Sequence, residues 1–245
     1  VSRSAGGLRV DLRRTDTSMP VTFEVDEVIN ATGFVCPLRD LPALGLATFG
    51  QSALPAMTPF WESATVPGIY FAGTIMQGQK GLAKHGIPPN SGAVHGHRYN
   101  GRIQARHIAE RHFRAVRERP VIPPGDLLGY LLDEATRAPE LWHQKAHLAR
   151  VVTVDPADGI RDAGIAPLAH ILDAGGPDAV VMTVEADGTG LIYPVAYVRA
   201  GGRVEEHALE PHPLLDFETR SHREQLAGVL GRVIPSYASV YAKPS

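Results

Sequence analysis

Two short apolar runs in this sequence each close on a small residue beside a glycine, a pattern that brings the backbone close to a bound molecule. The first run covers residues 28–34 and the second covers residues 67–74. Glycine lets the chain turn sharply and leaves open space where a side chain would otherwise stand. The pattern therefore indicates a nucleotide cofactor as the ligand. The two endings are Ala31-Thr32-Gly33 and Ala72-Gly73-Thr74.

A helix is predicted soon after the second run, and its first residues complete the candidate site. Asn90 or Ser91 can cap a helix that runs to about residue 117. The free N–H groups and the positive dipole end of such a helix favour an anion. Three glycines lie in its first turns, and each costs about 1 kcal/mol relative to alanine. We therefore expect this helix to lie close to a sheet or a ligand.

Taken in order, these features resemble flavoproteins with two dinucleotide-binding domains, a group that includes pyridine nucleotide-disulfide oxidoreductases and flavin-containing monooxygenases. Residues 26–34 look like the Ala-Thr-Gly crossover of that family, and residues 65–74 are similar to its second FAD motif. The family motif usually ends in Gly-Asp, whereas Thr74 stands at the Asp position here. A hydroxyl is a weaker acceptor than a carboxylate. The resemblance covers about residues 8–117.

The resemblance implies an α/β fold in which residues 1–125 are the C-terminal portion of an incomplete Rossmann-like FAD/NAD(P)-binding domain. It implies part of an FAD-dependent oxidoreductase that passes electrons from NAD(P)H through flavin to a small-molecule substrate or to oxygen. The helix start would then face the flavin pyrimidine edge, and no side chain is assigned as a catalytic acid, base or nucleophile. The cofactor-binding positions that it implies are Ala31, Thr32, Gly33, Gly73, Thr74, Asn90, Ser91, Gly92 and Ala93.

The pyrophosphate cradle of such a protein is missing from the sequence pattern. No Gly-x-Gly-x-x-Gly follows any predicted strand. We therefore expect the chain to be the C-terminal fragment of a longer enzyme, with the cradles of both cofactors on preceding polypeptide. We also expect the segment by itself to be inactive and to bind FAD poorly or not at all.

Other reactive side chains give weaker signals. Five histidines crowd residues 85–112, but His95 and His97 project about 200° apart on a helix, so no metal site is expected. His85 is expected in a loop, either near the flavin or substrate or simply in solvent. Cys36 is the only cysteine, which excludes dithiol chemistry within the chain and favours a buried structural thiol in a reducing cytoplasm.

The elements that must position these residues follow from hydrophobic periodicity. Alternating residues predict a hairpin over 8–12 and 21–25, and apolar residues predict buried strands at 28–29 and 69–72. Residues 126–245 are predicted to form a C-terminal α+β domain of unknown role. It begins with a helix after Asp126. Its predicted strands are 151–154 and an antiparallel meander of 179–185, 191–199 and 204–208; its later helices are 167–175 and 221–231.

Composition sets the limits on function. The 245 residues carry a net charge of −2, which gives no electrostatic argument for nucleic acid as a partner, and no apolar run approaches a membrane span. We expect no membrane partner either. Exposed meander edges would allow a homodimer. A different class of function stays open: a non-catalytic interaction or oligomerisation module derived from a flavoprotein.

Overall fold

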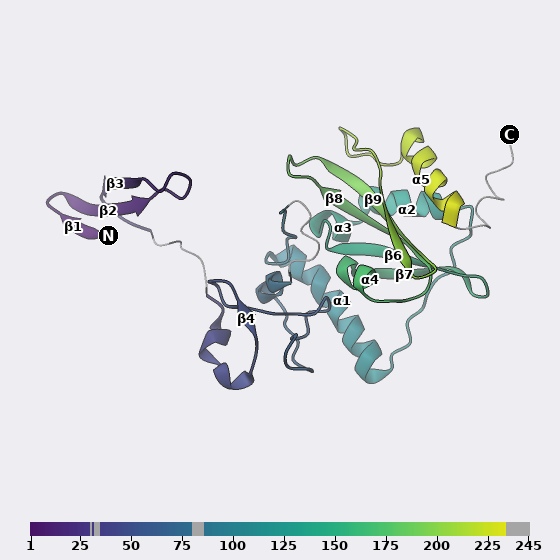
Figure 1. Cartoon of the computed structure of the whole chain (residues 1–245), viewed down its shortest axis with the longest axis horizontal. Helices are drawn as coiled ribbons and strands as arrows, with labels where there is room; N and C mark the ends of the chain where they lie inside the picture. Colours follow the sequence, from purple (N-terminus) through teal and green to yellow (C-terminus); the bar gives the residue numbers. More distant parts are fainter. Residues whose placement is uncertain (30, 32–34, 80–85, 234–245) are drawn as a thin grey trace. The chain divides into compact units, whose positions relative to one another are not determined.

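The alternating residues near the start of the chain form the predicted hairpin. The computed structural model describes residues 1–29, 31, 35–79 and 86–233, and it divides into two compact units, Val1–Val35 and Cys36–Ser245. In the first unit β2 (Gly7–Arg13) pairs antiparallel with β3 (Pro20–Val25), and β1 (Ser2–Ser4) adds to β2 (Figure 1). The expected continuation into a buried strand is wrong, because Val28 and Ile29 lie beyond β3 and are exposed.

The second unit is organised around a five-stranded antiparallel sheet with strand order β10-β9-β8-β6-β7. The predicted meander is confirmed as its last three strands. A side-chain oxygen of Asp187 accepts the backbone N–H groups of Thr189 and Leu191, which closes the turn between the first two of them. The strands are β6 (Leu148–Asp155), β7 (Gly159–Pro167), β8 (Ala179–Ala186), β9 (Ile192–Ala200) and β10 (Arg203–Ala208).

Strand β7 has no counterpart among the predicted strands, and its irregular register explains why. Val151 of β6 pairs with Gly164, but the next residue, Val152, pairs with Asp162. Ala163 is therefore an extra residue, a β-bulge that breaks the alternation of apolar and polar side chains. Gly164 adopts a φ of 77°, a left-handed conformation that favours glycine.

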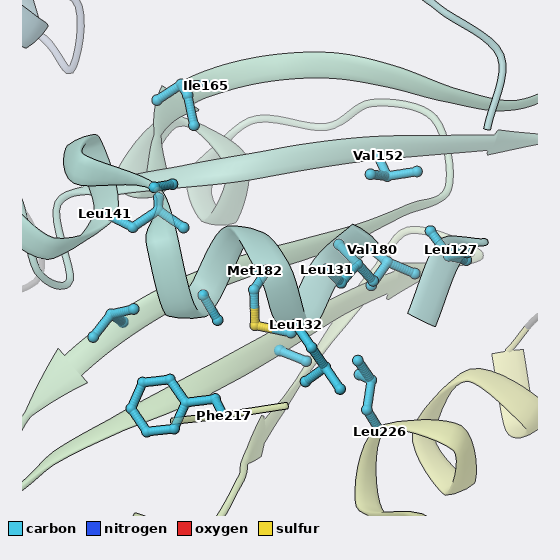
Figure 2. Packing of buried hydrophobic residues seen from close by; sticks show 14 of the residues in the cluster. Leu127, Leu131, Leu132, Leu141, Val152, Ile165, Val180, Met182, Phe217 and Leu226 are labelled. Atoms are coloured by element: carbon cyan, nitrogen blue, oxygen red, sulfur yellow. The ribbon is translucent and has the colours of Figure 1, made fainter. Parts of the chain in front are cut away.

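Alternate side chains of the central strands fill two separate cores. On one face Val180 and Met182 pack with three helices, and on the other Val181 packs with the short helix α4 (Leu168–Asp173). Figure 2 shows the first core, where Leu131 and Leu132 lie between the sheet and Leu226. The three helices of the first face are α2 (Leu127–Arg137), α3 (Pro139–His143) and α5 (Arg220–Val233). The predicted helices after Asp126, near 167–175 and near 221–231 are thus confirmed.

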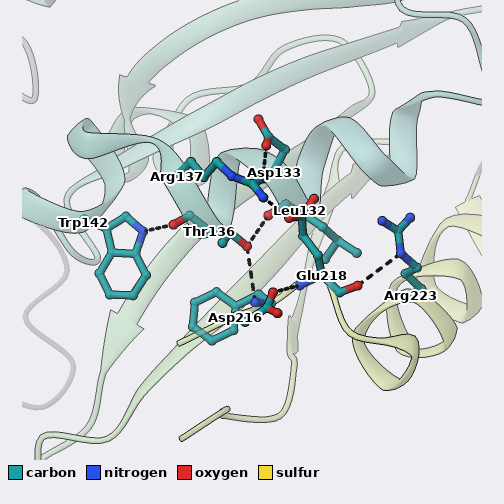
Figure 3. A network of polar contacts seen from close by, with 9 residues as sticks. Leu132, Asp133, Thr136, Arg137, Trp142, Asp216, Glu218 and Arg223 are labelled. Carbon is teal, nitrogen blue, oxygen red and sulfur yellow. Dashed lines mark hydrogen bonds and ion pairs between the residues drawn. The ribbon is translucent and has the colours of Figure 1, made fainter. Parts of the chain in front are cut away.

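Polar contacts around Thr136 fasten the segment before α5 to the end of α2. The Thr136 hydroxyl donates to the Leu132 carbonyl at 2.8 Å and accepts the Phe217 N–H at 3.3 Å (Figure 3). The Trp142 indole N–H donates to the Thr136 carbonyl at 3.0 Å. Arg137 also reaches across from α2 to form an ion pair with Glu218. The loop thereby closes over the core, with Phe217 fully buried.

Residues 36–79 lead into the long helix α1 (Val94–Phe113) and contain little regular structure. The predicted strand over 69–72 does not form: Tyr70 makes only an isolated bridge with Glu62. The short elements in this stretch are η1 (Pro37–Asp40), η2 (Pro42–Leu44), β4 (Thr48–Phe49), β5 (Leu54–Pro55) and η3 (Thr74–Gly78).

The architecture is a mixture of helix and antiparallel sheet. Every strand pair within the described ranges is antiparallel, so the Rossmann-like part of the expected fold is not confirmed. The expected domain boundary at residue 125 stays a prediction, and α1 packs against α3 across it. Among the described helices, none combines the length and the apolar composition needed to cross a bilayer.

A buried and an exposed leucine test the contribution of the first core to stability. Leu131 is fully buried, whereas Leu214 is 83% exposed. We expect Leu131→Ala to lower the free energy of unfolding by about 2–5 kcal/mol because it leaves a cavity, and Leu214→Ala to change it by less than about 0.5 kcal/mol. Urea denaturation measures both. Equal effects of the two substitutions would contradict this description of the core.

Candidate functional site

Residues 60–79 lie along α1 and run in the opposite direction to it. Near the end of α1, Arg111 forms a 2.6 Å ion pair with the buried carboxylate of Glu62. In the middle, the Gln104 side-chain amide donates to the Phe71 carbonyl at 2.8 Å. At the start of the helix, Gln77 packs against Gly92, where an added Cβ would lie 2.9 Å from its Oε1 atom. These contacts place the Gly73-Thr74 pair beside the first half of the helix.

Gly73 has a backbone conformation that only glycine adopts readily. Its φ of 86° and ψ of −153° fall in a region that a side chain would strain. Among the described residues, no heavy atom lies within 4 Å of the position that its Cβ would occupy. The glycine is therefore required by backbone shape, and it leaves the chain open to an approaching molecule. Thr74, which begins η3, is exposed next to it.

The start of α1 differs in detail from the prediction. The helix begins at Val94 with Ala93 as its N-cap, and no side chain caps it. Instead the Asn90 carbonyl accepts the Ala93 N–H at 3.0 Å. That carbonyl lies so close to the helix that a Cβ on Gly96 would come within 1.7 Å of its oxygen. Gly96 is thus required by the tight turn that leads into the helix.

Ser91 belongs to a buried polar network. Its hydroxyl accepts a hydrogen bond from the Asn100 amide at 3.0 Å and donates one to the Gln144 Oε1 atom at 3.3 Å. The Gln144 amide also donates to the Asn100 Oδ1 atom at 2.9 Å and to the Gly96 carbonyl at 3.0 Å. All three side chains are completely buried. The Ser91 side chain therefore holds α1 to the end of α3.

The structure brings together one part of the predicted cofactor site. Gly73 caps the start of η3 and Thr74 is its first residue, and Gly92 touches that segment through Gln77. Asn90, Ser91 and Ala93 are the immediate neighbours of Gly92, and the Asn90 side chain is exposed while Ser91 is buried.

The remaining predicted cofactor-binding positions belong to the first unit or lie outside the described residues. Ala31 is exposed and belongs to the first unit, whereas Thr32, Gly33 and the loop histidine His85 lie outside the described residues.

Cys36 is buried and its sulfur is a free thiol, as expected for a structural cysteine. Its backbone N–H donates to the Ser52 carbonyl at 2.7 Å.

Two histidines come together farther along α1, where the sequence pattern indicated only a general crowding. The His107 ring stacks on Phe60 with centroids 3.9 Å apart, and His170 of α4 meets the same ring edge-on at 4.8 Å. Burial lowers the pKa of both imidazoles. The local sequence signal of close packing in this region is Gly164 in β7. A glycine inside a strand indicates a bulge or the close approach of another group.

A third histidine lies inside the protein. His147 is fully buried, and neither of its ring nitrogens has a hydrogen-bond partner among the described residues. Its ring meets Trp61 edge-on with centroids 5.8 Å apart. Burial lowers the pKa of His147 to about 4, so the imidazole is neutral at neutral pH.

The buried network should govern how firmly α1 is held. In Gln144→Leu, the Ser91, Asn100 and Gly96 groups lose partners, and each unpaired buried group costs about 1–3 kcal/mol. We expect the free energy of unfolding to fall by at least about 2 kcal/mol, with faster hydrogen exchange in the first turns of α1 than in α2. The exposed Gln51→Leu is the matched control. Equal exchange rates in α1 of both variants would contradict this role.

His147 should make stability depend on pH. Its folded pKa of about 4 lies below the ordinary value of 6.5, so the unfolded chain takes up the proton first as pH falls. Stability is thus fully present above pH 6.5 and is lost toward pH 4, by about 3 kcal/mol in total. We expect His147→Leu to remove most of this loss, measured by denaturation at about pH 7 and about pH 4.5. A variant at exposed His112 should keep it, and the same loss in His147→Leu would refute the assignment.

Comparison with protein-family models, with curated protein sequences and with solved structures finds no match to this chain. Function therefore has to be argued from the geometry alone. That geometry consists of an open, glycine-only turn at Gly73, an exposed Thr74 and a helix start whose approach is fixed by Gly96.

Proposed function

We propose that this chain is part of an FAD-dependent oxidoreductase that passes electrons from NAD(P)H through flavin to a small-molecule substrate or to oxygen. The observation that carries the proposal is the conformation of Gly73. Its backbone adopts a shape available to glycine, faces open space, and lies on the segment that packs against the start of α1. A turn of this kind beside a helix N-terminus is a suitable place for a planar ligand with a polar edge.

The residues present fit one edge of a flavin. The Gly73 backbone would lie against the ring system, with the exposed Thr74 hydroxyl and Asn90 amide as polar contacts. The backbone N–H group of Gly92, at the positive end of a 20-residue helix, would favour negative charge on the ligand, whereas the Ala93 N–H already donates to the Asn90 carbonyl. The bound flavin would supply the redox chemistry, while these residues bind and orient it.

Contacts within the protein limit which groups are available to the proposed flavin. The Ser91 hydroxyl is occupied by Asn100 and Gln144, so Ser91 contributes its backbone and not its side chain. The Ala31-Thr32-Gly33 contribution, the Rossmann-like completion of the fold and the pyrophosphate cradle remain parts of the proposal that depend on preceding polypeptide. NAD(P)H would bind there too.

A second candidate function is a non-catalytic interaction module derived from a flavoprotein. The observation in its favour is that the helix start is held by protein groups, with Ser91 buried against Gln144. A homodimer through the meander edge receives less support. The edge strand β10 carries exposed charges at Arg203 and Glu205, and charged edge strands resist pairing with a second sheet.

Two glycines with nearly equal φ angles test the flavin proposal. Gly73 has a φ of 86° and Gly68 a φ of 84°, and in the described part of the chain neither has a heavy atom within 4 Å of the position that a Cβ would occupy. We expect Gly73→Ala to lower flavin content at least tenfold, and Gly68→Ala to leave it unchanged. Both φ angles lie in a region that side chains rarely adopt, so both substitutions strain the backbone by about 1–3 kcal/mol, but only Gly73 would face the ligand. Visible flavin absorbance is measured in the chain joined to the polypeptide encoded ahead of it.

Two outcomes would contradict the proposal. If the joined protein carries no flavin, or if Gly73→Ala and Gly68→Ala retain equal amounts, the open turn is not a flavin contact. Stoichiometric flavin in the isolated chain would contradict a different part, the expectation that the phosphate-binding residues lie on preceding polypeptide.

A further inference from the structure

Two adjoining pockets lie toward the C-terminal half of α1, away from the helix start. The larger has a volume of about 460 Å³ and the smaller about 170 Å³. Three charged residues line both of them: Arg106, Glu110 and Arg117. The other walls come from β6, β7, α4, Phe60 and the segment 115–120 after α1, so the pockets depend on packing within the second unit and not on the turn at Gly73.

Arg117 is held in an unusual position for a cation. Its guanidinium packs against the β7 bulge, where a Cβ on Gly164 would lie 1.5 Å from one of its nitrogens. Burial lowers the pKa of Arg117, and the like charge of Arg106 lowers it further. Its attraction to Glu110 and Asp162 is purely coulombic, without a hydrogen bond among the described residues. A desolvated guanidinium whose donors lack acceptors favours an incoming oxyanion.

The neighbouring Arg150 shows the contrast. It forms ion pairs with Glu134 at 2.7 Å and with Asp162 at 3.3 Å, and its guanidinium is largely buried between them. These two carboxylates pair with the Arg150 guanidinium. Arg150 therefore lines the larger pocket, but its charge is already neutralised. Arg117 and the exposed Arg106 are the cations that remain for a ligand.

The smaller pocket is mainly apolar. Ile103, Val151 and Ile165 contribute aliphatic walls, and the aromatic part is formed by Phe60. His107 and His170 complete it as imidazoles whose pKa burial lowers, so near neutral pH they add little positive charge. An apolar cavity of about 150 Å³ can take up benzene, so a space of this size accommodates a single ring.

We propose that these pockets form a binding site for an organic carboxylate with a compact apolar body, such as one aromatic ring. The carboxylate would lie between Arg117 and Arg106, where a guanidinium can donate two parallel hydrogen bonds. The apolar body would enter the smaller pocket beside Phe60. The site is independent of the proposed flavin contact, and either can exist without the other.

Binding of three probes to the full chain tests the site by isothermal titration calorimetry. Benzoate carries both features, benzamide keeps the ring without the charge, and inorganic phosphate keeps the charge without the ring. We expect saturable binding of benzoate, with benzamide and phosphate each at least tenfold weaker. Loss of a hydrogen bond to a charged group and loss of ring burial are each large enough for such a ratio.

Matched variants locate the binding. Arg117→Gln removes the cation, and Arg102→Gln on the same helix as Arg106 removes a charge that does not line either pocket. Gly164→Ala displaces Arg117, whereas Gly159, the first residue of β7, has the same φ of 77° and no described heavy atom within 4 Å of an added Cβ, so Gly159→Ala is the control. We expect Arg117→Gln and Gly164→Ala to lose at least tenfold in benzoate affinity. We expect Arg102→Gln and Gly159→Ala to change it by less than twofold.

Several results would overturn the proposal. One is that the unmodified chain shows no saturable binding of benzoate. Another is that benzamide binds as tightly as benzoate, and a third is that Arg117→Gln leaves the affinity for benzoate unchanged. Phosphate binding as tightly as benzoate would overturn the apolar part and leave a simple oxyanion site. If Gly164→Ala fails to unfold cooperatively, Arg117→Gln still decides the outcome, because it leaves the β7 backbone unaltered.

Discussion

The buried polar face of α1 is the constraint on which the second unit depends. A helix in this position would ordinarily bury leucines, but α1 buries Gly96, Asn100, Ile103 and Gln104. Two of these are amides, and a buried amide stabilises a fold only when its hydrogen bonds are made. Gln144 satisfies the first and the Phe71 carbonyl accepts from the second. The position of the helix is thus specified by partners that must all be in place.

This arrangement joins two regions of very different character. The five-stranded sheet is covered by apolar cores on both faces. The stretch before α1 contains mostly turns and short 3-10 helices, so it has little regular structure of its own. Because α1 packs against η3 and against α3, which itself contacts β6 and β8, the helix connects the sheet region with the turn at Gly73. Residues on such a turn can be positioned for a ligand without a strand beneath them.

Glycines mark the two places where function is proposed, for two different physical reasons. At Gly73 the backbone shape requires glycine and the surrounding space is open, which suits contact with a ligand. At Gly164 the shape requires glycine and the space is filled by Arg117. In the second case the missing side chain lets a cation approach a strand, and the cation rather than the backbone would meet the ligand.

The sequence by itself determined the elements whose patterns are local. Alternation over 8–12 and 179–208 predicted the hairpin and the meander, and turn residues marked where they reverse, because period-two burial and glycine conformations act over a few residues. The local pattern misled at 28–29 and at 69–72, where the described apolar residues form no strand and Tyr70 makes only an isolated bridge with Glu62. It also missed β7, whose bulge interrupts the alternation.

Only the tertiary structure decided which candidate residues meet. Serine is a residue type that often caps a helix. The Ser91 hydroxyl, however, donates a hydrogen bond to Gln144, which lies 53 residues away in the chain. His107 and His170 share one aromatic ring through the packing of α1 against α4 and the sheet, and Arg117 faces a glycine on a distant strand. Contacts of this kind depend on long-range packing and on whether each buried polar group finds a partner. A local sequence pattern shows neither the long-range packing nor these partners.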